Sequence, residues 1–260
     1  MSDTATSVPA PVQRPRALRF EWLLPVLIRP RQGFASIVEE TRGIWLTPIL
    51  LLMGTSIVRV IAAGVTRAPG ELSLPPGFEY YSPEQQAQFM QAAQATSGPV
   101  FVYVFPAIIA LLSVWVGWLI ASGVVHFVLT IQGGRGTTLR SANVVAWAGL
   151  PFAVRDIVRF AAMLIAGQPI ASPGLSGFIT PDAPGIALFA ASLLALVDLY
   201  ILWHIVLVIV GMHAAEPDLP VLRVVASVSL VMLILLALQA GAGFAGTQLQ
   251  RLTVTQPFFF

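Results

Sequence analysis

The chain has 260 residues, of which 57% are hydrophobic and only 10% are charged, whereas about 25% of the residues in an ordinary soluble domain are charged. It contains no cysteine, which excludes disulfides, cysteine-ligated zinc and thiol catalysis. The formal net charge of +2 is small, so the position of the charges along the chain is more informative than their sum.

The first part of the chain divides into two segments. Residues 1–16 are polar and proline-rich, and they are expected to form a disordered cytoplasmic tail without a cleavable signal peptide. Residues 17–42 mix aromatic and aliphatic residues with arginines, and prolines interrupt the segment. We expect short amphipathic helices here, which either lie in the membrane interface or pack on the cytoplasmic side of the membrane domain. The candidates for contact with lipid headgroups are Arg19, Trp22, Arg29 and Arg31.

Five apolar stretches follow, and each has the ~20 residues that a membrane-spanning helix needs. They are residues 44–63, 99–131, 143–167, 185–212 and 219–245. The sequence therefore predicts an all-α, polytopic membrane protein with five transmembrane helices within residues 43–245. Between the first two stretches, Ser82, Pro83 and Gln85 are typical of a capped helix start, so a short outside helix is expected at residues 83–95.

The arginines outside the apolar stretches predict the orientation. If the N-terminus is cytoplasmic, only Arg67 and Arg251 lie outside. The arginines on or near the cytoplasmic side are then Arg14, Arg16, Arg19, Arg29, Arg31, Arg42, Arg135, Arg140 and Arg223. Because cytoplasmic loops carry the excess of basic residues, we expect a cytoplasmic N-terminus and an outside C-terminal tail at residues 246–260. The plasma membrane of a prokaryote is the expected location.

Four ionisable residues form a predicted intramembrane polar cluster. Asp198 lies in the middle of the fourth stretch, and Arg155, Asp156 and Arg159 lie in the third. A charged residue at the bilayer centre costs about 2.5–3.5 kcal/mol on insertion scales, so each needs a partner. By depth, Asp198 is expected to meet Arg155, and Asp156 can pair with Arg159 along one helix. The cluster is either a clamp that fixes helix packing or a relay for protons or ions.

Two histidines, His126 and His204, lie toward the cytoplasmic ends of their stretches and could approach each other, with His213 nearby. Zinc usually takes three or four ligands at recognisable spacings. We therefore expect structural, hydrogen-bonded histidines, no metal site and no cofactor. Gly174-Leu175-Ser176-Gly177 matches the nucleophile motif of rhomboid-type intramembrane serine proteases. Ser176 is expected in an outside loop, away from both histidines, so a catalytic role is not expected.

Glycine and other small residues form two further patterns. Residues 133–136, Gly-Gly-Arg-Gly, lack the Lys-Ser/Thr end of a phosphate-binding P-loop, and they are expected to form a turn in which Arg135, with Arg140 after it, touches lipid phosphate. Small residues recur four apart at Gly117 and Ala121, at Ala142 and Ala146, and at Ala237, Gly241 and Ala245. Such residues allow helices to approach closely, either within one chain or between chains.

The chain resembles the Yip1 domain family of five-span membrane proteins, in its compact prokaryotic form, over residues 28–242. The matching segments are Arg29-Pro30 with Phe34 and Ile37, Trp45-Leu46-Thr47-Pro48, Gly133-Gly134-Arg135-Gly136, Ala146-Trp147-Ala148-Gly149-Leu150-Pro151, Asp198-Leu199-Tyr200-Ile201-Leu202-Trp203 and Val210-Gly211-Met212. The resemblance implies no enzymatic activity. Eukaryotic relatives are implicated in Golgi and endoplasmic-reticulum trafficking, with Rab GTPases and one another as partners. Their Asp-Leu-Tyr-Gly-Pro signature is missing here, so Rab binding is not carried over.

These observations favour a non-catalytic scaffold, assembly factor or membrane-organising protein that contacts the lipid bilayer and binds other membrane proteins or itself. No nucleic-acid partner is expected. The alternative is a small transporter or channel subunit that uses Arg155, Asp156 and Asp198.

Overall fold

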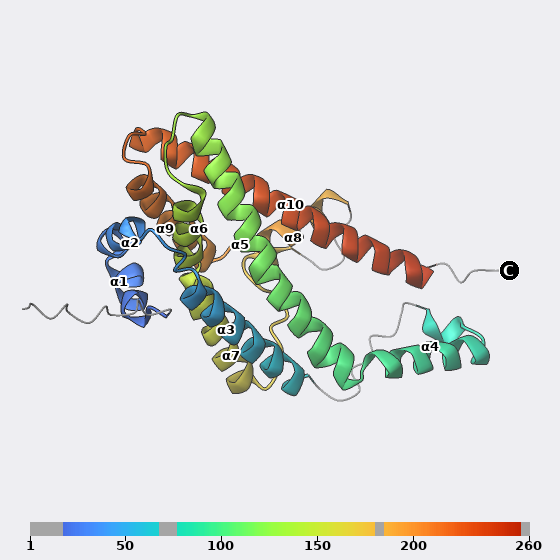
Figure 1. Cartoon of the computed structure of the whole chain (residues 1–260). Coiled ribbons are helices and arrows are strands. Elements are labelled where there is room, and N and C mark those ends of the chain that lie inside the picture. Colours follow the sequence, from blue (N-terminus) through green and yellow to red (C-terminus); the bar gives the residue numbers. More distant parts are fainter. Residues whose placement is uncertain (1–17, 68–76, 180–184, 256–260) are drawn as a thin grey trace, which may run out of the picture.

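The structure is a computed structural model that describes residues 18–67, 77–179 and 185–255. Of the described residues, 80% are helical, and these residues form no strand. The predicted all-α class is confirmed. A bundle of shorter helices occupies one end of the molecule, and two long helices extend away from that end (Figure 1).

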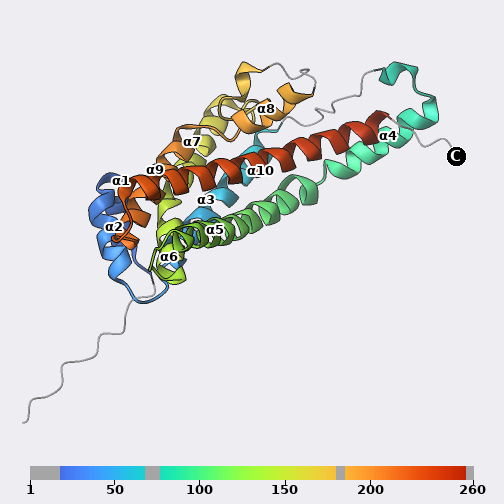
Figure 2. The ribbon, with the colours of Figure 1, turned by 90° about the horizontal axis from the view of Figure 1, so that it is seen from above.

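Three helices are long and apolar enough to cross a membrane: α3 (Leu46–Val65), the π-helical turn η3 with α5 (Val100–Ile131), and α10 (Val221–Thr255). The π-helical turn η3 (Val100–Val104) ends two residues before Pro106, which cannot donate a backbone hydrogen bond to the turn before it. The long helices α5 and α10 run side by side (Figure 2). The helix α10 extends beyond the last predicted stretch, which ends at residue 245, and continues to Thr255. The sequence has no proline between Val221 and Thr255.

The third and fourth apolar stretches are each divided. The third forms α6 (Thr138–Ala148) and α7 (Leu150–Ala166), which are interrupted at Gly149. The fourth forms α8 (Ile186–Leu194) and α9 (Leu199–Ala215), which meet at a bend of 67° and count as one span at most. The described residues thus contain three or four candidate membrane-spanning helices instead of five confirmed ones. The helix α7, with 17 residues and three charges, is not among these candidates.

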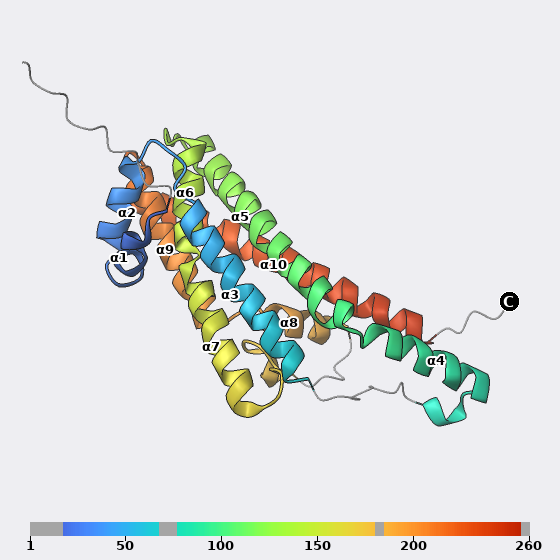
Figure 3. The ribbon, with the colours of Figure 1, turned by 60° about the horizontal axis from the view of Figure 1, so that its bottom comes forward.

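The N-terminal segment packs against the bundle, which is one of the two arrangements expected for it. It contains η1 (Phe20–Trp22), α1 (Leu23–Ile28) and α2 (Pro30–Glu39), and α2 lies on α9 and α6 (Figure 3). Val26, Phe34 and Ile37 are completely buried by this packing. The opposite side of the segment, with Phe20, Leu24 and Ile28, remains exposed.

The core is centred on α6, whose side chains Val144, Trp147 and Ala148 have no exposed area. Asn143 on α6 satisfies the backbone of the link between α2 and α3: its Oδ1 accepts from Ile44 N–H at 3.0 Å, and its Nδ2 donates to Arg42 O at 2.9 Å. Trp147 Nε1 donates to Ile44 O at 3.1 Å. Because buried backbone groups need partners, these three bonds fix where α3 begins relative to α6.

The predicted helix start at Ser82 is present. The helix α4 covers Pro83–Thr96, and Ser82 and Gln85 exchange side-chain and backbone hydrogen bonds in a capping box. It follows the short turn η2 (Phe78–Tyr80) and leads into η3 and α5. This helix lies beyond the start of α5, far from α1 and α2 (Figures 1 and 3).

Candidate functional site

The charged residues predicted within the third and fourth stretches meet in the structure, and Arg59 of α3 joins them. Arg159 Nη2 donates to Asp198 Oδ2 at 3.2 Å, and Arg155 Nη1 lies 3.7 Å from the same oxygen. Asp156 Oδ1 lies 3.0 Å from Arg59 Nε and 3.9 Å from Arg155 Nε. Arg155 therefore links two carboxylates, and the five side chains form one cluster across α3, α7 and the start of α9.

Of the two ion pairs predicted from the sequence, one is present and the other is replaced by a different pair. Asp198 meets Arg155, as its depth suggested. Asp156 pairs with Arg59 of the neighbouring helix instead of with Arg159 on its own helix. The reason is geometric: α7 packs along α3 (Figure 3), which buries Asp156 to 7% exposure, while Arg159 points to the beginning of α9. Arg59 lies within the first predicted stretch, and the sequence analysis did not include it in the cluster.

Asp198 lies at the break between α8 and α9, and the expectation that it lies inside a continuous helix was wrong. Its Oδ1 accepts from Ile201 N–H at 2.9 Å, which makes Asp198 the N-cap of α9. A carboxylate at this position satisfies a free N–H group and interacts favourably with the positive end of the helix dipole. The same carboxylate binds Arg159, so it both starts α9 and ties that start to α7.

The charges of the cluster are arranged with the acids inside and the arginines around them. The side chains of Asp156 and Asp198 are 7% and 13% exposed, whereas those of the three arginines are between 22% and 32% exposed. The guanidinium of Arg155 also lies over the Phe152 ring, 4.7 Å from its centroid. This geometry suits a clamp, because each carboxylate already has two arginine neighbours.

The two histidines have separate partners. His204 is buried, its Nδ1–H donates to Ala148 O at 2.8 Å, and its ring lies 4.7 Å from that of Phe152. His126 Nδ1 lies 3.3 Å from Ser141 Oγ. Each histidine thus bonds to α6, which matches a structural role for both.

The Gly174–Gly177 segment, which matches a protease motif, is a turn packed on the α8–α9 break. Ser176 Oγ donates to Pro173 O at 2.7 Å, and Leu175 N–H donates to Leu194 O at 2.9 Å. Gly174 has a φ of +60°, and a Cβ added there would lie 2.6 Å from Leu194 O. The glycine is therefore required by close packing of the backbone, and the serine hydroxyl is used within the turn.

Two of the candidate lipid-contact residues make contacts within the protein. The guanidinium of Arg19 pairs with Glu40 at 2.8 Å and lies 5.0 Å from the centroid of the Trp22 ring. Trp22 in turn packs edge-on against Trp147 of the core, with 5.7 Å between ring centroids. The other candidates remain on the surface: Arg29, Arg31 and Arg135 are exposed, and Arg140 is half-buried.

Glu216 is the polar residue that the sequence interpretation missed. It follows the last residue of α9 and is only 2% exposed. Its Oε2 accepts from Arg135 N–H and Gly136 N–H, each at 2.8 Å. Successive backbone N–H groups in a glycine-rich turn form an anion-binding nest. The Gly-Gly-Arg-Gly turn had been compared with a phosphate cradle, and the anion that it holds is the protein's own carboxylate.

This contact ties the loop between α5 and α6 to the loop between α9 and α10. A side chain at Gly136 would overlap Glu216 Oε1, so the turn needs glycine for this approach. The sequence features that could have indicated this contact are an acidic residue in a tight loop and a glycine-rich turn. The contact was not predicted because Gly136 and Glu216 are 80 residues apart in the sequence.

Replacing Glu216 with alanine is expected to lower the free energy of unfolding by about 1–3 kcal/mol, because two partly buried N–H groups lose a charged acceptor. Glu216→Gln keeps an acceptor oxygen without the charge, so its loss should be intermediate. The matched control is Glu39→Ala at an exposed position, with an expected change below ~0.5 kcal/mol. Thermal unfolding in detergent measures all three, and equal midpoints for Glu216→Ala and Glu39→Ala would contradict the contact.

Comparison with known proteins agrees with the resemblance seen in the sequence. The model of the Yip1 domain matches residues 24–241, which contain the charged cluster, the Gly-Gly-Arg-Gly turn and Glu216. No curated protein and no solved structure matches the chain. Since the matched region covers most of the chain, the protein belongs to the Yip1 domain family.

Proposed function

We propose that this Yip1-family membrane protein is a non-catalytic scaffold or assembly factor in the plasma membrane of a prokaryote. It binds other membrane proteins, or a second copy of itself, within the bilayer. The observation that carries this proposal is the surface of α5. In the most apolar part of this span only 6% of residues are buried inside the protein, compared with 39% for α3 and 28% for α10.

The uncovered surface of α5 is apolar along its whole length. Its exposed large side chains include Phe105, Ile109, Leu112, Val116, Ile120 and Phe127. Only lipid tails or helices of other membrane proteins can cover such a surface in a bilayer. A helix held by its neighbours on one narrow side and free on the others offers the space that a partner helix needs.

The α5 surface also contains places for close helix approach. A Cβ added at Gly117 or at Gly123 meets no atom within 4 Å, and both glycines are exposed. Ala121 lies one turn after Gly117, which gives the small-xxx-small spacing found where membrane helices meet. We therefore place the partner helix against α5 near Gly117.

The bend before α9 supports a second candidate, a small transporter or channel subunit. Broken helices with charges at the break line the substrate sites of many transporters, and Asp198 lies at such a break. The cluster contains three arginines and two aspartates, an excess of one positive charge. Pairing of both carboxylates favours the scaffold, because a relay needs groups that are free to change partners.

Gly117→Leu tests the partner surface. The tagged variant is crosslinked in intact membranes and purified in mild detergent, and its partners are identified by mass spectrometry. We expect the variant to accumulate normally and to lose at least about tenfold of a partner that is near-stoichiometric with the wild type, because leucine blocks close helix approach. The matched control is Gly54→Leu on α3, where an added Cβ also meets no atom within 4 Å. Recovery of the wild type only as an uncrosslinked monomer, or equal losses in both variants, would contradict the proposal.

Asp198→Asn separates the two candidates. Asparagine caps a helix about as well as aspartate, so the variant removes the charge and keeps the cap. The clamp predicts a loss of stability on the order of 1–3 kcal/mol, somewhat below the value for a fully buried pair because both arginine partners are partly exposed. The control is Asp218→Asn in the exposed loop after α9, which should behave like the wild type. Unchanged stability and abundance, together with loss of ion flux in liposomes, would favour the transporter.

A further inference from the structure

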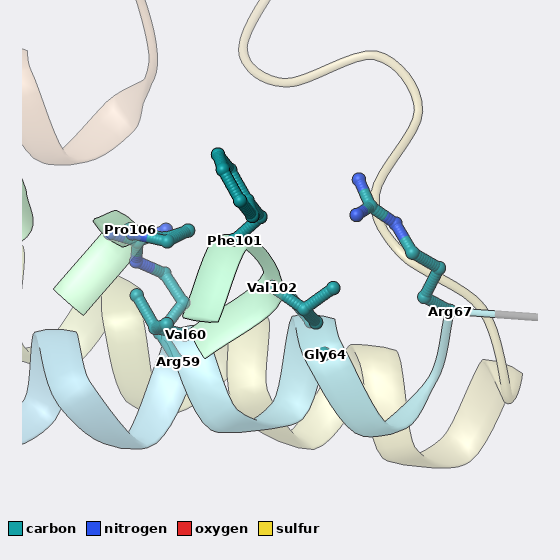
Figure 4. Close-up of a pocket in the computed structure, with 8 residues that line it drawn as sticks. Arg59, Val60, Gly64, Arg67, Phe101, Val102 and Pro106 are labelled. Carbon is teal, nitrogen blue, oxygen red and sulfur yellow. The ribbon is translucent and has the colours of Figure 1, made fainter. Parts of the chain in front are cut away.

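A cavity of about 170 Å³ lies between the end of α3 and the start of the α5 span (Figure 4). The α3 side contributes Arg59, Ala63 and Arg67, and the other wall contains Phe101, Val102 and Pro106. In Figure 4 the two arginine side chains lie on either side of Phe101 and Val102. This cavity is separate from the α5 surface proposed above for a partner helix.

One wall of the cavity is formed by η3, which packs tightly against α3. The ring of Tyr103 lies directly against Gly64, where any side chain on α3 would overlap it. The wall itself is the π-helical turn η3, a form of helix that is rare and frequent at functional sites. The contact between Gly64 and Tyr103 thus holds α3 and η3 close together at one end of the cavity.

The described residues that line the cavity carry positive charge. Two of them are ionisable, and both are arginines. Arg59 directs its Nε to Asp156 at 3.0 Å, and its side chain remains 32% exposed. Arg67 is exposed just beyond the end of α3. With one neighbouring carboxylate for two guanidinium groups, a positive charge remains at the cavity, and it suits an anion with several oxygens because the planar guanidinium matches phosphate geometry.

The depth of the cavity matches the edge of a bilayer. The 20 residues of α3 extend ~30 Å, about the thickness of the hydrocarbon core. Arg67 follows Val65, the last residue of the helix, and so lies at the level of headgroups. Arg59 lies six residues before Val65, and therefore ~9 Å below the end of the helix. Exposed apolar side chains continue toward the bilayer centre, among them Val58, Phe105 and Ile108.

We infer that this cavity is a binding site for a phosphate-bearing anion, held between Arg59 and Arg67. An anionic phospholipid fits both features of the site, since its phosphodiester reaches the arginines while an acyl chain lies on the apolar surface below. Free phosphate shares the chemistry of recognition and is the other source of the ligand. Binding here would hold α3 and the start of α5 together from the membrane surface.

The test is native mass spectrometry of the purified full-length chain with phosphatidylglycerol, phosphatidylcholine or inorganic phosphate. We expect the wild type to retain phosphatidylglycerol in preference to phosphatidylcholine, and inorganic phosphate not to displace it. Arg67→Gln should weaken retention about fivefold to tenfold, the effect of losing one charge-assisted contact. Ala63→Leu keeps the charge and fills the cavity, and it should weaken retention to a similar degree.

The control is Arg42→Gln, which removes an exposed arginine before the opposite end of α3 and should change retention less than about twofold, as for a surface charge screened by solvent. Equal losses for Arg42→Gln and Arg67→Gln would overturn the site, because they indicate general attraction to charge. Equal retention of both lipids, with no phosphate bound, would also overturn it. Binding of inorganic phosphate that depends on Arg67, without retention of lipid, would keep the site and assign it to the free anion.

Discussion

The pairing of Asp156 and Asp198 with three arginines is the constraint on which the arrangement of the helices depends. An unpaired charge in a region of low dielectric costs several kcal/mol, so α7 can carry Arg155, Asp156 and Arg159 only where α3 and the start of α9 supply partners. Those partners are Arg59 at 3.0 Å from Asp156 and Asp198 at 3.2 Å from Arg159. The packing of α7 on α3 and the beginning of α9 at Asp198 are consequences of the same cluster.

Glu216, at the other end of α9, is likewise a buried charged group that has partners. Its carboxylate satisfies two backbone N–H groups of the Gly-Gly-Arg-Gly turn, and Asn143 satisfies the backbone between α2 and α3 in a similar way. These polar contacts join segments that are distant in sequence. They leave the apolar face of α5 uncovered, which is the surface on which the scaffold proposal depends.

The sequence was sufficient for features that depend on local composition. Hydropathy identified α3, α5 and α10, and the Ser82–Gln85 pattern identified the start of α4. The sequence was insufficient where one or two residues divide a long apolar stretch into two helices. This occurs at Gly149, before the proline at the start of α7, and at Asp198, which caps α9. A hydropathy window averages over such positions. The pairing of Asp156 with Arg59, and of Glu216 with Gly136, requires knowledge of which helices are neighbours, and a single sequence does not contain it.

The central claim is that the charged cluster is a clamp, and a double-mutant cycle on Arg59 and Asp156 tests it most directly. Arg59→Gln, Asp156→Asn and the double variant are compared with the wild type by unfolding in detergent. Removing one member of a buried pair leaves the other uncompensated, whereas removing both does not. The account predicts that the double variant is more stable than the sum of the single losses by about 1–3 kcal/mol. Additive losses would show that the two side chains do not interact, and they would contradict the clamp.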